Sequence, residues 1–300
     1  MKSRSRRPAI AFFAALVTLG LWCAASIGAP AVAGATTAAT PQYLALGGSA
    51  SVGVQPTSTA PRGQPTDTGY ADDLVPLIRQ RWPGLQLNQL GCPGATISTF
   101  LYGRGRCHYA TGTQLSAAIS FLGSHPATTR LVTIDLGFNN IRPCLMRGLV
   151  NQVCLSKGLR LLRQQLPVAL ASLRRAAGNQ VDIVGVGHYD PFVVASTGRS
   201  SRRSFAATSV GAVEQLNSTL RSIYGRFGVA MADVSNAFDM TRRNAVIVAG
   251  RSEPKNSARA CELTWMCAGH PYGPNQHPND AGYRVIAQAI AQALPRPSTA

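Results

Sequence analysis

Acidic residues are scarce in this 300-residue sequence, where 12 Asp and Glu stand against 29 Lys and Arg. Such a positive balance suits an anionic partner, of which nucleic acid is the usual example. The arginines are scattered along the chain and no nucleic-acid-binding motif accompanies them, so we expect no nucleic acid partner. An anionic cell-envelope surface is a second partner class. The simpler interpretation is an arginine-rich surface in contact with solvent.

The sequence also lacks Cys-x-x-Cys pairs, internal repeats and low-complexity segments. The missing cysteine motif argues against a thiolate metal site, and nothing in the chain implies a metal or an organic cofactor. A length of 300 residues with 45% hydrophobic content suits one domain with one sizeable core. We expect that domain to be a monomer.

The first 33 residues have the pattern of a signal peptide. Basic residues precede an uncharged run from Pro8 to about Ile27, and Ala31-Val-Ala33 offers a small-residue cleavage site. The run is also about long enough to span a bilayer, so an uncleaved anchor is the alternative. We expect a secreted or cell-envelope protein with a flexible segment over 34–41 and a single domain over 42–295.

The cysteines are even in number once Cys23, within the leader, is set aside. An even number in an exported chain predicts disulfides. Six cysteines can pair in many ways, and proximity in the sequence is the only basis for choosing among them. It favours three local pairs, Cys92–Cys107, Cys144–Cys154 and Cys261–Cys267.

Short apolar runs alternate with helical patterns along the domain. We predict strands over 42–46, 85–90, 130–136, 181–186 and 229–234, and helices over 68–82, 113–123, 158–177, 209–227 and 279–294. This alternation indicates an α/β fold with a parallel sheet covered on both faces, in the strand order 2-1-3-4-5. Pro167 should kink or interrupt its helix. Residues 200–204 and the third cysteine pair are expected in loops.

Four residues in the predicted turns suit acyl transfer, which needs a nucleophile, a base and donors for an oxyanion. Ser49 follows the first strand, Gly94 and Asn139 follow the second and third, and His277 precedes the last helix. The carboxyl ends of parallel strands meet at one rim, so these residues should gather there. Ser49 is the candidate nucleophile, His277 the base, and the Gly94 N–H and the Asn139 amide the oxyanion donors. His188, after the fourth strand, is a less favoured base.

The order and spacing of these segments resemble the SGNH (GDSL-type) hydrolase family. The matching segments are Gly47-Gly48-Ser49, Gly94, Gly137-Phe-Asn139-Asn140 and Pro274-Asn-Gln-His277-Pro278. The local cysteine pairs are similar to those of secreted actinobacterial members. The resemblance implies a flavodoxin-like three-layer α/β/α sandwich and ester hydrolysis through an acyl-serine.

Three positions where the family usually has aspartate carry other residues here: Gly48, Asn140 and Pro274. The last aspartate would normally orient the histidine. A backbone carbonyl near Pro274, or the amide oxygen of Asn275, can accept the imidazole N–H instead. The sequence therefore predicts a secreted serine esterase or lipase that acts on small-molecule or lipid esters. The alternatives are a catalytically degenerate cell-envelope binding protein and a sugar O-deacetylase.

Overall fold

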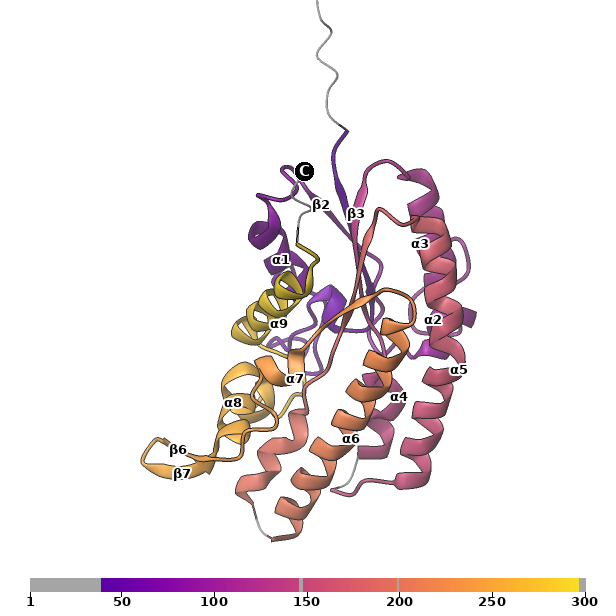
Figure 1. The fold of residues 1–300 in the computed structure, drawn as a ribbon. Coiled ribbons are helices and arrows are strands. Elements are labelled where there is room, and N and C mark those ends of the chain that lie inside the picture. Colours follow the sequence, from indigo (N-terminus) through magenta and orange to yellow (C-terminus); the bar gives the residue numbers. More distant parts are fainter. Residues whose placement is uncertain (1–38, 146–147, 199, 297–300) are drawn as a thin grey trace, which may run out of the picture. The chain divides into compact units, whose positions relative to one another are not determined.

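Five parallel strands form the central sheet of the computed structural model, which describes residues 39–145, 148–198 and 200–296 (Figure 1). The strand order is β2-β1-β3-β4-β5, as predicted. The predicted leader over 1–33 lies outside the described residues, as does most of the segment 34–41. The strands are β1 (Gln42–Gly47), β2 (Gln86–Gln89), β3 (Thr129–Asp135), β4 (Asp182–Val186) and β5 (Ala230–Ala232).

Side chains of the central strands alternate between two cores, because successive residues of a strand point to opposite faces of the sheet. Leu44 and Leu46 pack in one core, whereas Tyr43 and Ala45 pack in the other. Helices α2 (Ile97–Tyr102), α3 (Gln114–Ser124), α5 (Gln152–Ala177) and α6 (Ser200–Gly225) supply most of the first core. Helices α1 (Tyr70–Ile78), α8 (Lys255–Leu263) and α9 (Asp280–Ala293) supply the second, together with the short α7 (Val234–Ala237). The result is the predicted α/β/α sandwich.

Two helices depart from the predicted bounds. Helix α5 begins at Gln152, where the side chain of Asn151 accepts a hydrogen bond from the Cys154 N–H and caps it. It continues through Pro167, so of the kink or interruption predicted there the interruption is wrong. Helix α6 begins at Ser200, and the loop predicted over 200–204 is also wrong. Its first turn is polar because it is exposed, and its buried face starts only at Phe205.

The region around the third cysteine pair, predicted as a long loop, contains regular structure. A two-stranded antiparallel hairpin of β6 (Ala245–Val248) and β7 (Arg251–Pro254) precedes α8, and the 3-10 helix η4 (Trp265–Cys267) follows it. The hairpin is separate from the central sheet. Its two strands are short, and their side chains are mostly exposed, so no buried alternation marks them in the sequence.

The three disulfides join the cysteines that proximity favoured: Cys92–Cys107, Cys144–Cys154 and Cys261–Cys267. None of the helices in the described ranges is both long enough and apolar enough to cross a membrane.

Candidate active site

One pocket lies at the carboxyl ends of the strands and draws its walls from four separate segments. Ser49 comes from the end of β1, Asn139 from the turn after β3, His188 from the turn after β4, and His277 from the segment before α9. The structure therefore brings together three of the four residues that the sequence singled out, and His188 with them. Other lining residues include Gly48, Ala50, Asp135, Phe138, Tyr189, Pro191, Gln276 and Pro278.

Ser49 occupies the sharp turn that links β1 to the 3-10 helix η1 (Ala50–Val52). Gly47 makes this turn possible with φ +124°, a conformation that residues with a Cβ rarely adopt. A Cβ at that position would also lie 2.7 Å from the backbone nitrogen of Asp135. The Ser49 hydroxyl makes no hydrogen bond within the described residues, so it is free to meet a substrate.

The carboxylate of Asp135, at the end of β3, holds the turn that carries Ser49. It accepts hydrogen bonds from the N–H groups of Gly48 and Ser51, the latter at 2.9 Å, and a further one from Ala50. The Ser49 N–H has no such partner in the described chain and lies at the pocket, where a helix N-terminus favours negative charge. Burial raises the pKa of Asp135 to about 7.

Asn139 lies in the first turn of the short helix α4 (Phe138–Ile141) and ties this turn to the one after β2. Its Nδ2 donates to the carbonyl of Ala95 at 3.1 Å. The next residue, Asn140, accepts a bond from the N–H of Ile97 at 3.1 Å through its Oδ1. The amide thus serves as an acceptor at a position where a carboxylate was expected. Gly94 lies in the same turn as Ala95 with φ +84°, and it is not among the residues that line the pocket.

Asn275 orients His277. The Oδ1 of Asn275 lies 2.7 Å from His277 Nδ1 and also accepts the backbone N–H of His277 at 3.1 Å. Its Nδ2 donates to the carbonyl of Pro61 at 3.1 Å, which fixes the orientation of the amide. An amide oxygen only accepts, so Nδ1 must carry the proton and Nε2 keeps its lone pair. Of the two acceptors considered from the sequence, the amide oxygen is the one in place. No bond to the Pro274 carbonyl is present in this part of the chain.

The environment of His277 favours the neutral imidazole. Burial, and next the nearby positive charge of Arg142, lower its pKa to about 4. Arg142, in the 3-10 helix η2 (Arg142–Leu145), is held there by a 2.9 Å hydrogen bond from its Nε to Gln276 Oε1. A neutral histidine with a free Nε2 can accept a proton, which is the state that a general base needs.

His188 shares the pocket but is occupied elsewhere. Its Nε2 lies 3.2 Å from the carbonyl of Leu136, so the proton sits on Nε2 and that nitrogen cannot act as a base. Burial lowers its pKa to about 4. Its backbone is fixed by Asn217, which accepts from the His188 N–H at 2.9 Å and donates to its carbonyl at 2.7 Å. His188 therefore supports the chain that leads into Asn139.

Tyr189 and Asp135 contribute to the site without having been predicted from the sequence. The hydroxyl of Tyr189 donates to the carbonyl of Gln276 at 2.6 Å and so supports the residue before His277. An acidic residue at the end of an apolar strand, as in Ile134-Asp135-Leu136, was the available signal for Asp135. Within the described ranges, no three His, Cys, Asp or Glu side chains gather in a way that could hold a metal ion.

Models of protein families and curated proteins give no match to this chain. Solved structures do. Phospholipase A1 from Streptomyces albidoflavus matches with a TM-score of 0.54 and 19% identity, over 85% of this chain and 100% of that one. The extracellular lipase from Streptomyces rimosus matches with a TM-score of 0.51 and 20% identity, over 85% of this chain and 100% of that one. A protein described as a GDSL-like lipase from Parabacteroides merdae matches with a TM-score of 0.50 and 12% identity, over 84% of this chain and 94% of that one. The chain therefore has the fold of SGNH (GDSL-type) hydrolases.

Proposed function

We propose that this protein is a serine hydrolase of carboxylic esters. One observation carries the proposal. The Asn275 amide oxygen holds Nδ1–H of His277, which leaves Nε2 basic in the pocket that also contains Ser49. Shared fold with three structures named as lipases supports the same reaction class. The substrate class is small-molecule or lipid esters.

The reaction proceeds in two halves. His277 Nε2 takes the proton of the Ser49 hydroxyl as its oxygen attacks the ester carbonyl, and the carbonyl oxygen becomes an oxyanion. Imidazolium then gives that proton to the leaving alcohol, which departs and leaves an acyl-serine. Water then loses a proton to His277 and attacks the carbonyl of the acyl-serine. The ester bond to Ser49 breaks, His277 returns the proton to the Ser49 oxygen, and the acid is released. No hydrogen bond joins Ser49 to His277 in this structure, and catalytic hydrogen bonds of this kind often tighten only in the complex with substrate.

The oxyanion lies near three candidate donors. The Ser49 N–H and the side-chain amide of Asn139 border the pocket directly. The Gly94 N–H belongs to the turn that Asn139 holds through Ala95, so a small closure of this turn on substrate would add it. Donors of this kind act where negative charge develops, which lowers the barrier rather than merely binding the ester.

We propose that the protein acts outside the cytoplasm, like the secreted actinobacterial SGNH hydrolases that its cysteine pairs resemble. Three disulfides suit an oxidising compartment. The leader pattern over 1–33 supports export.

Hydrolysis of short- and medium-chain nitrophenyl esters by the oxidised protein tests the proposal. Ser49→Ala and His277→Ala should each abolish turnover. Ser124→Ala and His125→Ala, at the far end of α3, serve as matched controls and should keep it. A parent no faster than its Ser49→Ala variant on every ester would refute the hydrolase and favour a binding protein on the same scaffold.

A further inference from the structure

The β6–β7 hairpin stands away from the rest of the described chain. It pairs Ala245 with Pro254 and Val248 with Arg251, and it extends beyond α8 at the lower left of Figure 1. Its packing partners are α8 and the 3-10 helix η3 (Pro191–Thr197), which follows the site residue Tyr189. A hairpin of two short strands is only marginally stable alone in water, so its contacts with α8 and η3 hold it in place.

The tip of the hairpin is apolar and exposed. Ile247 is 74% and Val248 40% exposed, and no residue from Ala245 to Gly250 has a polar side chain. Ala249 and Gly250 both have positive φ, at +48° and +77°, in a turn that usually takes Asn-Gly. Alanine accepts backbone strain there that asparagine would relieve, and it keeps β6 and the turn free of polar side chains. On β7, the exposed Arg251 lies opposite Val248.

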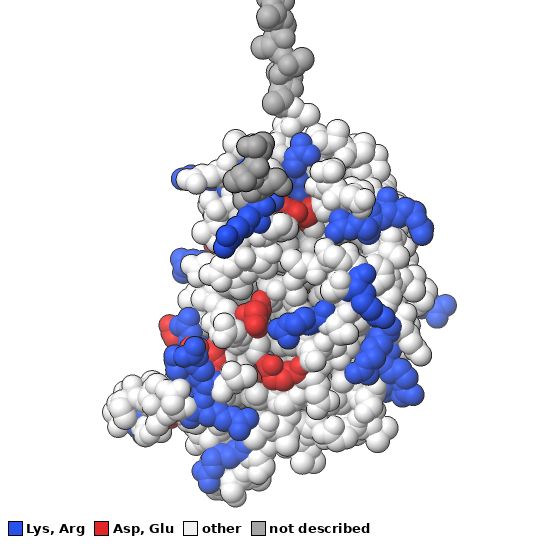
Figure 2. Space-filling view, viewed as in Figure 1, with Lys and Arg blue, Asp and Glu red and all other residues white. Residues whose placement is uncertain are grey.

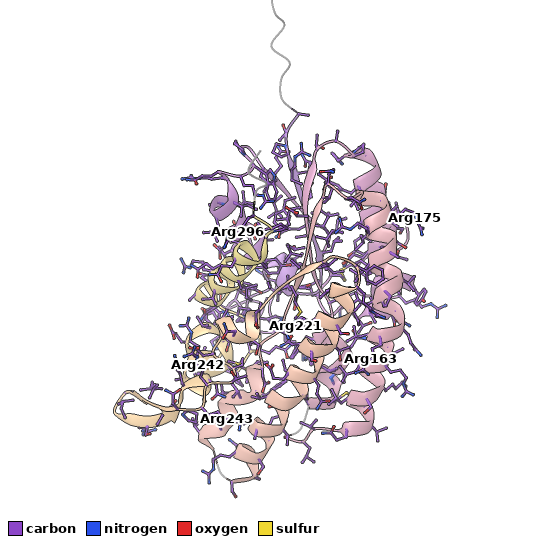
Figure 3. The ribbon with its side chains drawn as sticks, viewed as in Figure 1. Arg163, Arg175, Arg221, Arg242, Arg243 and Arg296 are labelled. Carbon is purple, nitrogen blue, oxygen red and sulfur yellow. A yellow bond between two sulfur atoms is a disulfide. The ribbon has the colours of Figure 1, made fainter. Side chains whose placement is uncertain are left out.

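Basic residues surround the base of the hairpin. Figure 2 shows them clustered at its lower left, and Figure 3 places Arg242 and Arg243 where the chain enters β6. Asp239 accepts ion pairs from Arg242 at 3.0 Å and from Lys255 at 3.1 Å, so part of this charge is neutralised locally. Residues 239–262 and the start of α6 carry the basic Arg202, Arg203, Arg242, Arg243, Arg251, Lys255 and Arg259 against the acidic Asp239, Glu253 and Glu262.

A cavity at the base of the hairpin joins these charges to unpaired polar atoms. Arg203 and Arg243 line it together with Ser196 and Asn256. The Ser196 hydroxyl and the Asn256 Oδ1 are buried without a hydrogen-bond partner among the described residues, and Asn256 is only 3% exposed. Guanidinium groups suit phosphate, and a buried acceptor beside them suits a hydroxyl donor. A glycerol phosphate headgroup offers both.

We propose that the β6–β7 hairpin docks the protein onto an anionic phospholipid surface. Ile247 and Val248 enter the region between headgroups and acyl chains, and the arginines at the base lie at the level of the phosphates. A four-residue strand spans about 13 Å, which is enough for the tip to reach about 5–10 Å into this region while the base stays outside it. Charge complementarity selects the anionic lipid, because an apolar tip alone would not distinguish it from a neutral one.

Vesicle flotation with the Ser49→Ala protein tests this docking without any hydrolysis, so the outcome is separate from that of the proposed reaction. We expect binding to phosphatidylcholine vesicles that contain phosphatidylglycerol, little binding to phosphatidylcholine alone, and a decrease with salt. Adding Ile247→Ser and Val248→Ser should lower binding at least about tenfold. Adding Val168→Ser, a residue 54% exposed on α5, should leave it unchanged.

A second pair of variants tests the charges. Arg203→Gln with Arg243→Gln should lower binding to the anionic vesicles at least about tenfold, whereas Arg163→Gln with Arg175→Gln on α5 should not. Circular dichroism and melting temperature confirm that each variant folds. Equal binding to neutral vesicles, or equal loss in the control pairs, would overturn the proposal. So would a parent that dimerises without lipid while the tip variant is monomeric, since the hairpin would then bind a second copy.

Discussion

The amide oxygen of Asn275 lies 2.7 Å from Nδ1 of His277, where it can orient the imidazole as a carboxylate would. The relationship preserves the direction of the hydrogen bond and the tautomer. It does not preserve the charge, because an amide cannot stabilise the imidazolium as a carboxylate does. Burial and next the Arg142 charge lower the pKa of His277, and the neutral amide does not offset them.

Asn275→Ala should lower kcat of ester hydrolysis by about tenfold to a hundredfold, since it removes the group that orients the His277 imidazole without removing a reacting group.

Asn275→Asp should move the acid limb of the kcat/KM profile to higher pH by about one to three units, because a carboxylate beside the ring favours imidazolium. The pH profile of both variants checks this. A limb that stays in place in Asn275→Asp would mean that His277 does not set it.

The parent should keep its activity to unusually low pH. Protonated His277 cannot accept the Ser49 proton, and burial with the Arg142 charge lowers the pKa of His277 to about 4. The acid limb that His277 sets should therefore appear only as pH drops through about 4. Arg142→Gln should move this acid limb to higher pH, because it removes a charge that lowers the pKa of His277. The move should be smaller than in Asn275→Asp. A profile that falls near 6.5, the ordinary histidine value, would contradict this environment.

Asn139→Ala should lower kcat about a hundredfold and change KM little, the pattern expected for a lost oxyanion donor. The same side chain holds the Ala95 carbonyl, so part of the loss could come from a loosened turn. Asn140→Ala separates the two effects, because it removes only the bond to the Ile97 N–H. A loss in Asn140→Ala as large as that in Asn139→Ala would assign the effect to the turn.

Asp135→Asn should lower kcat and also change how stability depends on pH. The folded pKa of Asp135 is about 7, against 3.8 ordinarily, so the folded state binds the extra proton between these values. Its contribution to stability is present at low pH and declines as pH rises through about 7. Urea unfolding at about pH 5 and about pH 8 should show this decline in the parent and a smaller one in the variant. Equal declines would exclude Asp135 as the titrating group.

The sequence contained enough to predict the sheet and most of the site. β1, β3, β4 and β5 are short and mostly apolar, whereas β2 reads Gln-Leu-Asn-Gln and is not buried. Ser49, Asn139 and His277 fall next to strand or helix ends that topology brings together. Asp135 was missed because its role depends on register, which places it opposite Gly47 on the neighbouring strand. Sequence alone does not show which end residue of one strand will meet the turn of the next.

The hairpin and the start of α6 escaped prediction for a different reason. Both are exposed, so neither has the buried periodicity by which elements are recognised in a sequence. The turn at Ala249-Gly250 also lacks the Asn or Asp that usually marks a hairpin. Asn275 was weighed beforehand as an acceptor, but only the Pro61 contact decides how its amide points.

Two of the three disulfides adjoin segments that carry part of the pocket, and the other adjoins the turn that Asn139 holds through Ala95. Cys92–Cys107 flanks the turn of Gly94, Cys144–Cys154 follows the helix of Asn139, and Cys261–Cys267 leads into the segment of His277. Thiol reduction should therefore abolish hydrolysis while far-UV circular dichroism keeps the signal of the sandwich. A chain still in its reduced form would then lack the proposed activity, and forming the three cystines would complete the pocket.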